Sequence, residues 1–309
     1  MAVKVLIIGF GSIAEKHYHA LLKIDPLVNV VAMRSHLKAE PKTNALSVYC
    51  MQEIIQNGPY DFVLISNPTY KHAETIEMML GLHCPLFIEK PLFHTLHAAH
   101  LLDKVSASGN LSYVACNLRF LDSLIYFKNF LLPNIKINEV NVYCGSFLPE
   151  WRPEVNYKNC YSANEKLGGG AHLDLIHELD YVYWLFGKPI EMRSYKSMKS
   201  TLGIDAIDYA NYLLEYEKFA VNIILNYFRK DKKRTIELVC SDDTYTIDLF
   251  SNTVSSSTEV LFKSEQAISD TYQKQLIYFI DRIKNISLDG KKIMNNIDEA
   301  FEVLKICLK

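Results

Sequence analysis

A glutamate and a lysine follow an apolar run in the segment Phe87-Ile-Glu89-Lys90-Pro91. Residues 85–88 have the composition of a buried parallel strand, which places Lys90 at the carboxyl end of that strand. Open α/β sheets bind their ligands at this edge, where a lysine can take part in proton chemistry. Pro91 disfavours helical backbone at Lys90 and allows a cis peptide bond, and either would fix where the lysine points. A surface lysine in a loop is the alternative.

A glycine-rich turn follows the apolar run 3–8 and precedes a helical pattern. It has the spacing Gly-x-Gly-x-x-Gly/Ala of dinucleotide-binding turns. Gly9 permits the tight turn, Gly11 lets a pyrophosphate approach the backbone, and Ala14 allows the helix to pack closely on the strand. N–H groups at the helix start would bind the phosphates. The predicted dinucleotide site is Gly9, Phe10, Gly11, Ser12, Ile13 and Ala14.

The second apolar run, residues 28–33, ends in Arg34 and Ser35. An NAD site usually carries an acidic residue near this place for the ribose 2′-hydroxyl, and none is present here. An arginine beside a serine can accommodate a 2′-phosphate, so the pattern favours NADP over NAD. The alternative is that Arg34 lies flat on the adenine ring, which either cofactor allows.

A second set of polar residues lies in the segment 168–187, which opens with Gly168-Gly-Gly170. Apolar residues at helical spacing predict a helix with a core stripe, and Asp174, His177 and Tyr181 fall together on another face. An Asp one turn from a His can hold the imidazole in one tautomer and raise its basicity. A solvated polar face is the alternative. The glycine run and the aromatic content favour a buried setting, in which such groups need a reason to be present.

The loop 147–161 precedes this glycine run and is predicted to face a substrate. It carries Arg152, Tyr157 and Tyr161. Arg152 can bind a carboxylate or a phosphate, which would suit an acidic or nucleotide-linked substrate. An exposed interface loop is the alternative.

These segments need elements to position them, and the pattern of the chain predicts two domains. Apolar runs alternate with helical patterns through residues 1–120, which predicts an α/β domain with a doubly wound parallel sheet. Strand patterns joined by short turns then dominate residues 121–309, which predicts a second, α+β domain with an antiparallel sheet. The Ser/Thr-rich stretch 251–259 is predicted to be a loop. Helices near 269–286 and 297–307 close the chain, and the last can return to the first domain.

Composition excludes several classes of protein. The formal net charge is −2, so no global field recruits nucleic acid or an anionic membrane, and the basic cluster 229–234 is predicted to be a solvated turn. The 7 cysteines form no CxxC pair, which argues against disulfides and zinc. The histidines at 94, 97 and 100 drift around their helix, so no metal site is predicted. With no signal-peptide or membrane-spanning pattern, we expect a cytoplasmic protein.

Together these motifs resemble the glucose-fructose oxidoreductase/inositol dehydrogenase (Gfo/Idh/MocA) family, over most of the chain. The resemblance implies an NAD(P)-binding Rossmann domain and a second domain whose open antiparallel sheet often mediates oligomerisation. It also implies a sugar-type substrate and a homo-oligomer, either a dimer or a tetramer. The motifs, in the family's order, are Gly9 to Ala14, Asn67-Pro68-Thr69-x-x-His72, Glu89-Lys90-Pro91, Asn117-Leu-Arg119-Phe120 and the segment 168–180.

The resemblance also implies roles for individual residues. Lys90 would be catalytic and touch both nicotinamide and substrate, while Asp174 and His177 would help to bind or deprotonate the hydroxyl. Many members space this Asp and His by four residues, whereas the gap here is three, so the division of roles within the pair stays open. His72 can also be an ordinary surface histidine. The further cofactor contacts would be Arg34, Ser35, Ser66, Asn67, Pro68, His72, Glu89, Lys90 and Asn117. The substrate contacts would be Arg119, Arg152, Tyr157, Tyr161, Asp174 and His177.

We therefore expect reversible hydride transfer between nicotinamide C4 and a carbinol carbon of a sugar, sugar acid or nucleotide-linked sugar. In the oxidation direction His177 takes the hydroxyl proton, Asp174 orients it or binds a neighbouring hydroxyl, and Lys90 stabilises the developing alkoxide. Two classes with the same fold stay open: a nicotinamide-binding regulator without turnover, and an NAD-dependent glycosidase. The presence of all three residues argues against the regulator.

Overall fold

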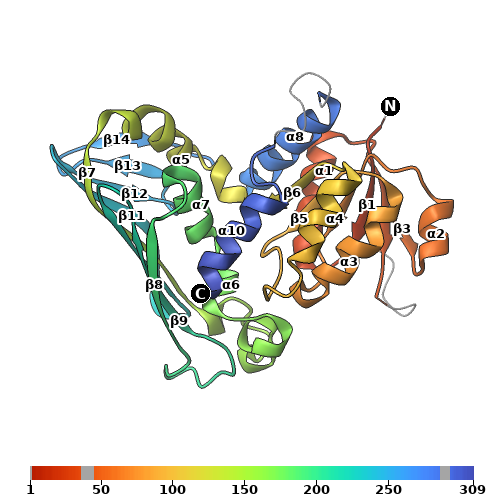
Figure 1. The fold of residues 1–309 in the computed structure, drawn as a ribbon, viewed down its shortest axis with the longest axis horizontal. Coiled ribbons are helices and arrows are strands. Elements are labelled where there is room, and N and C mark those ends of the chain that lie inside the picture. The colour runs from red at the N-terminus through yellow and green to blue at the C-terminus, as the bar shows by residue number, and fades with distance from the viewer. Residues whose placement is uncertain (1, 36–44, 286–292) are drawn as a thin grey trace. The chain divides into compact units, whose positions relative to one another are not determined.

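The computed structural model describes residues 2–35, 45–285 and 293–309 of the chain. The chain divides into two compact units. The first unit is formed by Met1–Asn117 with Ser269–Glu302, and the second by Leu118–Ile268 with Val303–Lys309. Each unit is built on one sheet (Figure 1). Within the described ranges, the helices are too short or too polar to cross a membrane.

The sheet of the first unit has six strands in the order β3-β2-β1-β4-β5-β6, and every neighbouring pair is parallel. Its central strands are apolar and buried on both faces, as a parallel sheet requires. The predicted doubly wound α/β sheet is therefore confirmed. The strands are β1 (Lys4–Ile8), β2 (Asn29–Met33), β3 (Ala45–Val48), β4 (Phe62–Ile65), β5 (Leu86–Glu89) and β6 (Ser112–Ala115).

Helices connect these strands, and one helix from the end of the chain joins them. Helix α8 packs beside α1, and its Phe279 lies edge-on to the rings of Phe62 and Phe87 in the sheet. Residues 269–302 therefore contribute to the core of the first unit. The helices are α1 (Ser12–Ile24), α2 (Met51–Gln56), α3 (His72–Met79), α4 (His100–Ser108) and α8 (Asp270–Lys284). Helix α10 (Ile297–Leu308) begins in the first unit and ends in the second. The predicted end of α8 at Ile286 lies outside the described residues.

The segment that leads into α10 covers the edge strand β6. Asn295 accepts a backbone hydrogen bond from Val114 at 2.9 Å, and its side-chain amide donates to the Val114 carbonyl at 2.7 Å. The Ile297 amide donates to Ser112 Oγ. An edge strand that is paired in this way does not offer its backbone to another chain.

The sheet of the second unit has eight strands in the order β14-β13-β12-β11-β7-β10-β9-β8. All neighbouring pairs are antiparallel except β7 and β10, which are parallel. The predicted α+β unit with a mostly antiparallel sheet is confirmed. The strands are β7 (Ile137–Phe147), β8 (Glu191–Ser197), β9 (Tyr209–Glu215), β10 (Ala220–Asn226), β11 (Phe228–Cys240), β12 (Thr244–Asp248), β13 (Thr253–Ser255) and β14 (Val260–Lys263).

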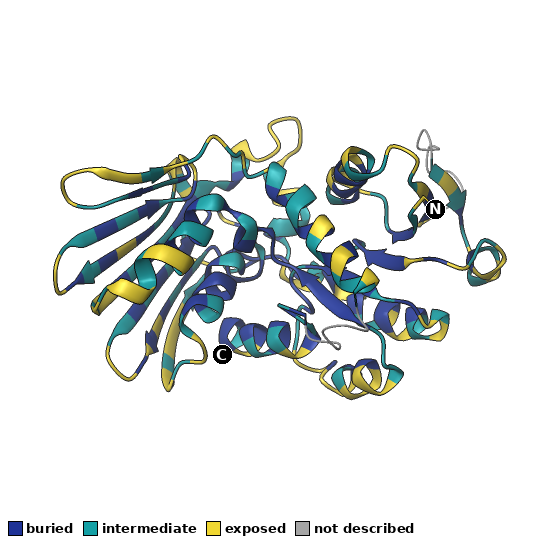
Figure 2. Cartoon of the chain, turned by 90° about the horizontal axis from the view of Figure 1, so that it is seen from above, coloured by how far each residue is buried: buried dark blue, intermediate teal, exposed yellow. Residues whose placement is uncertain are grey.

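The two faces of this sheet differ in burial (Figure 2). Along β9, Ala210, Tyr212 and Leu214 are buried, while the residues between them are half-buried or exposed. Helices lie on the buried face (Figure 1), because α5 packs on β12 and β14, α6 on β9 and β10, and α7 on β7. These helices are α5 (Asp122–Tyr126), α6 (Ala171–Asp174) and α7 (His177–Phe186).

The segment 168–187 differs from the single helix that its pattern predicts. Helix α6 ends at Asp174, Leu175 adopts φ −99° and ψ 28°, and α7 starts at His177. The apolar period continues through this interruption, so periodicity alone does not reveal it. Asp174 and His177 are consequently the last and first residues of two short helices.

Two surface predictions were wrong. The basic cluster 229–234 lies inside strand β11, not in a turn, and a break in the β7–β11 register between Phe228 and Lys233 accommodates it. Its charges have aromatic neighbours: the Arg229 guanidinium lies 5.0 Å from the centre of the Tyr143 ring. The Ser/Thr-rich stretch 251–259, predicted to be a loop, contains the short strand β13.

Candidate functional site

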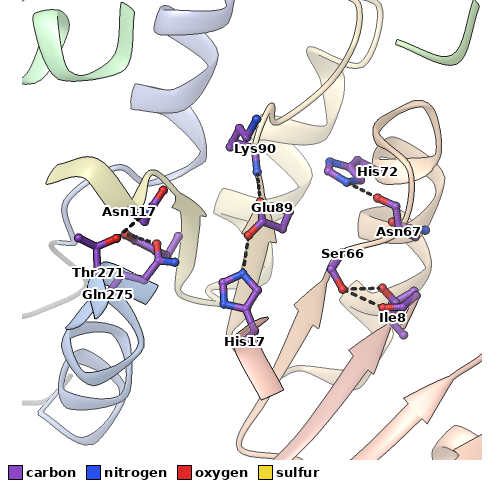
Figure 3. A network of polar contacts seen from close by, with 12 residues as sticks. Ile8, His17, Ser66, Asn67, His72, Glu89, Lys90, Asn117, Thr271 and Gln275 are labelled. Atoms are coloured by element: carbon purple, nitrogen blue, oxygen red, sulfur yellow. Dashed lines mark hydrogen bonds and ion pairs between the residues drawn. The ribbon is translucent and has the colours of Figure 1, made fainter. Parts of the chain in front are cut away.

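Four predicted cofactor-binding segments lie at the carboxyl ends of neighbouring strands in the first unit. The glycine turn follows β1, residues 66–68 follow β4, Glu89-Lys90 closes β5, and Asn117 lies just beyond β6. The order β1-β4-β5-β6 brings these segments to one edge of the sheet, as Figure 3 shows. This is the edge at which a doubly wound sheet binds a dinucleotide.

The two glycines of the turn meet different surroundings. Gly9 has φ 79°, and a Cβ on it would lie 2.7 Å from the Cα of Asn67. A Cβ on Gly11 would have nothing within 4 Å, and this residue precedes the first turn of α1. The Ser66 hydroxyl donates to the Gly9 carbonyl at 2.8 Å and so ties the turn to the end of β4. The space at Gly11 and the N–H groups of α1 fit a pyrophosphate.

Arg34 packs against the glycine turn. Its guanidinium carbon lies 5.8 Å from the centre of the Phe10 ring. Its Nη1 atom is buried and has no hydrogen-bond partner among the described residues, while Ser35 is exposed. A donor without a partner at the end of β2 fits the adenosine side of a dinucleotide.

Glu89 and Lys90 share a hydrogen-bond network with a histidine from α1 (Figure 3). Glu89 Oε1 lies 2.5 Å from His17 Nε2, and Glu89 Oε2 accepts the Lys90 backbone N–H at 3.2 Å. Glu89 and His17 are buried, and the Lys90 side chain is half-buried. The Lys90–Pro91 peptide bond is cis. Both Glu89 oxygens therefore have protein partners.

His72 is buried and is not the surface histidine that the sequence left open. Its Nδ1 lies 3.1 Å from the carbonyl oxygens of both Pro91 and Leu92, and its Nε2 lies 2.9 Å from the Asn67 carbonyl. Burial lowers the pKa of His72, and the hydrogen bonds to the three carbonyls oppose this shift. Its contacts favour a role in holding the backbone over the predicted contact with the cofactor.

Two asparagines at this edge use their amide groups within the unit. The Asn67 side-chain NH2 donates to Thr75 Oγ1 at 2.7 Å, and that of Asn117 donates to Thr271 Oγ1 at 2.6 Å. Asn67 Oδ1 is buried and has no hydrogen-bond partner among the described residues. A buried acceptor without a partner costs free energy, so it fits a donor from a ligand.

In the second unit, burial singles out the predicted Asp/His pair. Every residue from 168 to 182 is buried except Asp174 and His177, which are half-buried. The break between α6 and α7 lies between these two residues. The segment is therefore core structure that leaves two polar side chains accessible.

Two tyrosines contact this segment, one at Asp174 and one at the glycine run. The Tyr227 hydroxyl donates to Asp174 Oδ2 at 2.5 Å, and burial together with Asp174 raises the pKa of Tyr227 far above its ordinary value. The Tyr161 hydroxyl donates to the Gly168 carbonyl at 2.8 Å. A Cβ on Gly169 would overlap the backbone of Tyr161, so the glycine run is needed for this close approach.

The other predicted substrate residues are Arg119, which is buried in an ion pair, and Arg152 and Tyr157, which lie in the loop 147–161. Arg119 forms a buried, bidentate ion pair with Asp180, in which both side chains are almost completely inaccessible. This geometry favours a structural role for Arg119 over contact with a substrate. Arg152 is exposed, and Tyr157 donates its hydroxyl to the Leu202 carbonyl at 3.0 Å.

Two residues that contact site residues are not predicted from the sequence. His17 is a partner of Glu89, 72 positions away, and Tyr227 is a partner of Asp174, 53 positions away. His17 could have been noticed, because it lies one helical turn beyond Ala14 of the glycine motif. Nothing in the local sequence around Tyr227 indicates its partner.

A six-stranded parallel sheet with a glycine turn and a strand-end lysine, followed by a large mixed sheet, defines an NAD(P)-binding oxidoreductase with a Rossmann domain. Two sequence profiles confirm this assignment and the predicted family. Residues 3–115 match "Oxidoreductase family, NAD-binding Rossmann fold", and residues 136–246 match "GFO/IDH/MocA C-terminal domain". The chain belongs to the Gfo/Idh/MocA family of oxidoreductases.

The named relatives are distant in sequence. The rhizopine catabolism protein MocA of Rhizobium meliloti is 25% identical over 191 residues, 59% of this chain and 56% of that protein. Inositol 2-dehydrogenase 2 of Paenarthrobacter aurescens is 25% identical over 213 residues, 65% of this chain and 60% of that protein. The match thus spans less than two thirds of either relative.

Solved structures share the fold over nearly the whole chain. The WlbA dehydrogenase of Bordetella pertussis, solved in complex with NADH and UDP-GlcNAcA, has a TM-score of 0.78 at 16% identity. The alignment covers 98% of this chain and 92% of that one. At this identity the likeness concerns the fold alone.

Proposed function

We propose that this protein is an NAD(P)-dependent dehydrogenase or reductase that acts on a CH–OH group of a sugar, sugar acid or nucleotide-linked sugar. The observation that carries the proposal is the position of Lys90, directly after β5 and at the same sheet edge as the glycine turn. The half-buried Asp174 and His177, in a segment that is otherwise buried, support it from the second unit. The relative named as an inositol 2-dehydrogenase supports the substrate class, and a dehydrogenase of the same fold has been solved in complex with UDP-GlcNAcA.

Each residue has a distinct task in this proposal. The bound dinucleotide supplies or accepts the hydride at its nicotinamide ring. Lys90 donates a hydrogen bond to the substrate oxygen and stabilises negative charge that develops on it. His177 takes the hydroxyl proton during oxidation and returns it during reduction. Asp174, held by Tyr227, orients the proton acceptor or binds a neighbouring hydroxyl.

The test of this function uses substitutions at the first two of these positions. General acid–base help is worth on the order of a hundredfold to ten-thousandfold in rate, so Lys90→Ala and His177→Ala should each lower kcat by about that factor. The NADH dissociation constant should change less than about twofold, because neither side chain carries most of the cofactor contact. Turnover is followed by nicotinamide absorbance with myo-inositol and UDP-GlcNAcA. Wild-type turnover in both variants would rule out the assignment.

We also propose that the cofactor is NADP in preference to NAD, on the basis of Arg34. Arg34→Ala should raise the dissociation constant of NADPH about tenfold or more, because a charged contact to a phosphate is lost. It should change the NADH value much less. Fluorescence titration with both cofactors measures this, with the exposed Lys23→Ala as control. Equal losses for both cofactors would instead indicate that Arg34 lies on the adenine.

We propose that the protein forms a homo-oligomer through the outward face of the second sheet. Leu213 of β9 lies on that face with Tyr195 of β8, and both are exposed. The rings of Tyr195 and Tyr209 lie 6.2 Å apart. Analytical ultracentrifugation of the wild type and of Leu213→Lys tests the proposal. A wild-type monomer would contradict it.

A further inference from the structure

Lys90 lies between two chain segments that buried histidines hold (Figure 3). On its amino side, one carboxylate oxygen of Glu89 meets His17 Nε2 at 2.5 Å and the other accepts the Lys90 N–H at 3.2 Å. His17 is 0% exposed, and the Phe87 and Tyr272 rings pack edge-on against it. The Glu89 carboxylate thus links α1, the helix of the glycine turn, to the main chain of Lys90.

On the carboxyl side of Lys90, the hydrogen-bond partners of His72 among the described residues are all acceptors. Its Nδ1 faces the carbonyl oxygens of Pro91 and Leu92, and its Nε2 faces the carbonyl oxygen of Asn67. A carbonyl oxygen cannot donate, so His72 acts as a donor wherever it forms a hydrogen bond. The neutral ring carries one N–H, so it holds either the turn after β5 through Nδ1 or the loop after β4 through Nε2, and only the protonated ring holds both.

We propose that His17 and His72 are positioning residues for Lys90, which hold the main chain on its two sides through Glu89 and through the Pro91 and Leu92 carbonyls. The inference rests on the proposed function, in which Lys90 contacts the substrate oxygen. If these side chains only filled space, an apolar residue would do so at a lower cost in free energy, because burying an imidazole removes its polar nitrogens from water. Here both rings contact groups within two residues of one half-buried lysine.

A fixed main chain matters because the lysine side chain is long and flexible. Its ammonium can reach a reacting oxygen reproducibly only if its Cα is held, and a displacement of about 1 Å can cost on the order of a hundredfold in rate. The two histidines come from helices that follow β1 and β4, the strands next to β5 and beyond. They therefore tie Lys90 to the loops predicted to bind the dinucleotide.

Substitutions at His72 separate positioning from packing. The amide nitrogen of Asn is attached to Cγ, as Nδ1 is, so His72→Asn keeps a donor toward Pro91 and Leu92. His72→Gln keeps a donor toward Asn67 instead, because its amide nitrogen lies one bond further out. His72→Phe keeps the ring and removes both donors. A role in packing alone predicts that Phe is tolerated best, whereas positioning predicts that Asn is.

Substitutions at His17 test the other side. His17→Gln places an amide donor near the position of Nε2 and should retain the contact with Glu89, whereas His17→Leu removes it. The matched control is His19→Gln, on the same helix but exposed. His100→Gln, exposed at the start of α4, serves as control for the His72 variants.

The main readout is the position of Lys90 itself. Lysines are converted to ¹³C-dimethyl-lysine by reductive methylation, and the Lys90 resonance is identified by its absence in Lys90→Arg. We expect one resonance at the wild-type shift in the controls, His17→Gln and His72→Asn. In His17→Leu, His72→Gln and His72→Phe it should move toward the shift of exposed lysines or divide. An unmoved resonance in these three variants, folded as judged by circular dichroism, would overturn the proposal.

Turnover gives the second readout. The kcat of the three disrupting variants should fall about 10-fold to 100-fold, with KM for the sugar changed less than about threefold. If His72→Phe does not fold, the comparison of Asn with Gln decides, and equal behaviour of these two overturns the role of His72. If the wild type turns over neither test sugar, the proposed function fails, while the NMR comparison still decides whether the histidines position Lys90.

Discussion

The Tyr227 hydroxyl lies 2.5 Å from Oδ2 of Asp174, and Tyr227 itself is completely buried. The Trp151 and Tyr227 rings pack nearly perpendicular to each other, with ring centres 5.2 Å apart. Tyr227 follows β10 and Asp174 ends α6, two elements that pack on each other. The orientation of the Asp174 carboxylate therefore depends on the residue that connects strands β10 and β11.

We predict that Tyr227→Phe lowers kcat about tenfold or more, because a hydrogen bond to a charged group contributes about 1.5–3 kcal/mol. Steady-state kinetics with the sugar and nicotinamide cofactor measure the loss. Tyr216→Phe is the matched control: this buried tyrosine donates to the Gly187 carbonyl at 3.1 Å. Tyr216→Phe should lose about 0.5–1.5 kcal/mol of stability and keep its kcat. Equal kcat losses in both variants would show that Tyr227 acts only on stability.

The buried pair of Arg119 and Asp180 leads to a prediction about stability. Removing one partner, as in Asp180→Leu, should cost about 3–5 kcal/mol of unfolding free energy, because the other charge is left buried and unpaired. The double variant Arg119→Met/Asp180→Leu should recover much of this loss. Urea denaturation of the single and double variants measures both. Additive losses in the double variant would contradict the coupling.

The sequence predicted the first unit well because its signals are local. The runs ending at Ile8 and Met33 are strands that end at those residues, since a strand buried on both faces is a continuous apolar run. Turn residues such as Gly9 also carry their geometry in their own type, and Gly9 has the positive φ that only glycine adopts readily.

The remainder depended on tertiary contacts that no local pattern encodes. Arg119 has a structural role because it pairs with Asp180, 61 positions away. His72 is buried against the turn at Pro91 and Leu92. The interruption at Leu175 left the apolar period intact. Such pairs are determined by how the elements pack, so residue type alone left structural and functional roles equally open.

His172 leads to a prediction about acid stability. It is buried, its Nδ1 has no hydrogen-bond partner among the described residues, and burial followed by the Lys196 charge lowers its pKa to about 4. The unfolded chain takes up this proton near pH 6.5, whereas the folded protein does so only near pH 4. The stability that the folded protein gains from keeping His172 neutral is therefore fully present above pH 6.5. As the pH falls toward 4, the free energy of unfolding decreases by about 3 kcal/mol through this group.

The comparison with His172→Gln isolates this effect, because His72 adds a shift of the same direction in both proteins. Between pH 7 and pH 4 the wild type should lose more unfolding free energy than the variant, and the two curves should run parallel above pH 7. Chemical denaturation at several pH values gives both curves. Identical slopes in the acid range would show that His172 is protonated with an ordinary pKa.

Replacement by alanine is expected to lower the stability of the protein at Gly9 and its affinity for the dinucleotide at Gly11. Gly9→Ala forces an alanine to φ 79° and places its Cβ 2.7 Å from the Asn67 Cα, so stability should fall by about 1–2 kcal/mol or more.

Gly11→Ala meets nothing within 4 Å, and stability should change by less than about 0.5 kcal/mol. Its methyl group would nevertheless occupy the space that a pyrophosphate needs. We therefore expect Gly11→Ala to fold like the wild type but to bind NADH and NADPH about tenfold or more weakly, as measured by fluorescence titration. Wild-type affinity in Gly11→Ala would place the dinucleotide away from this turn.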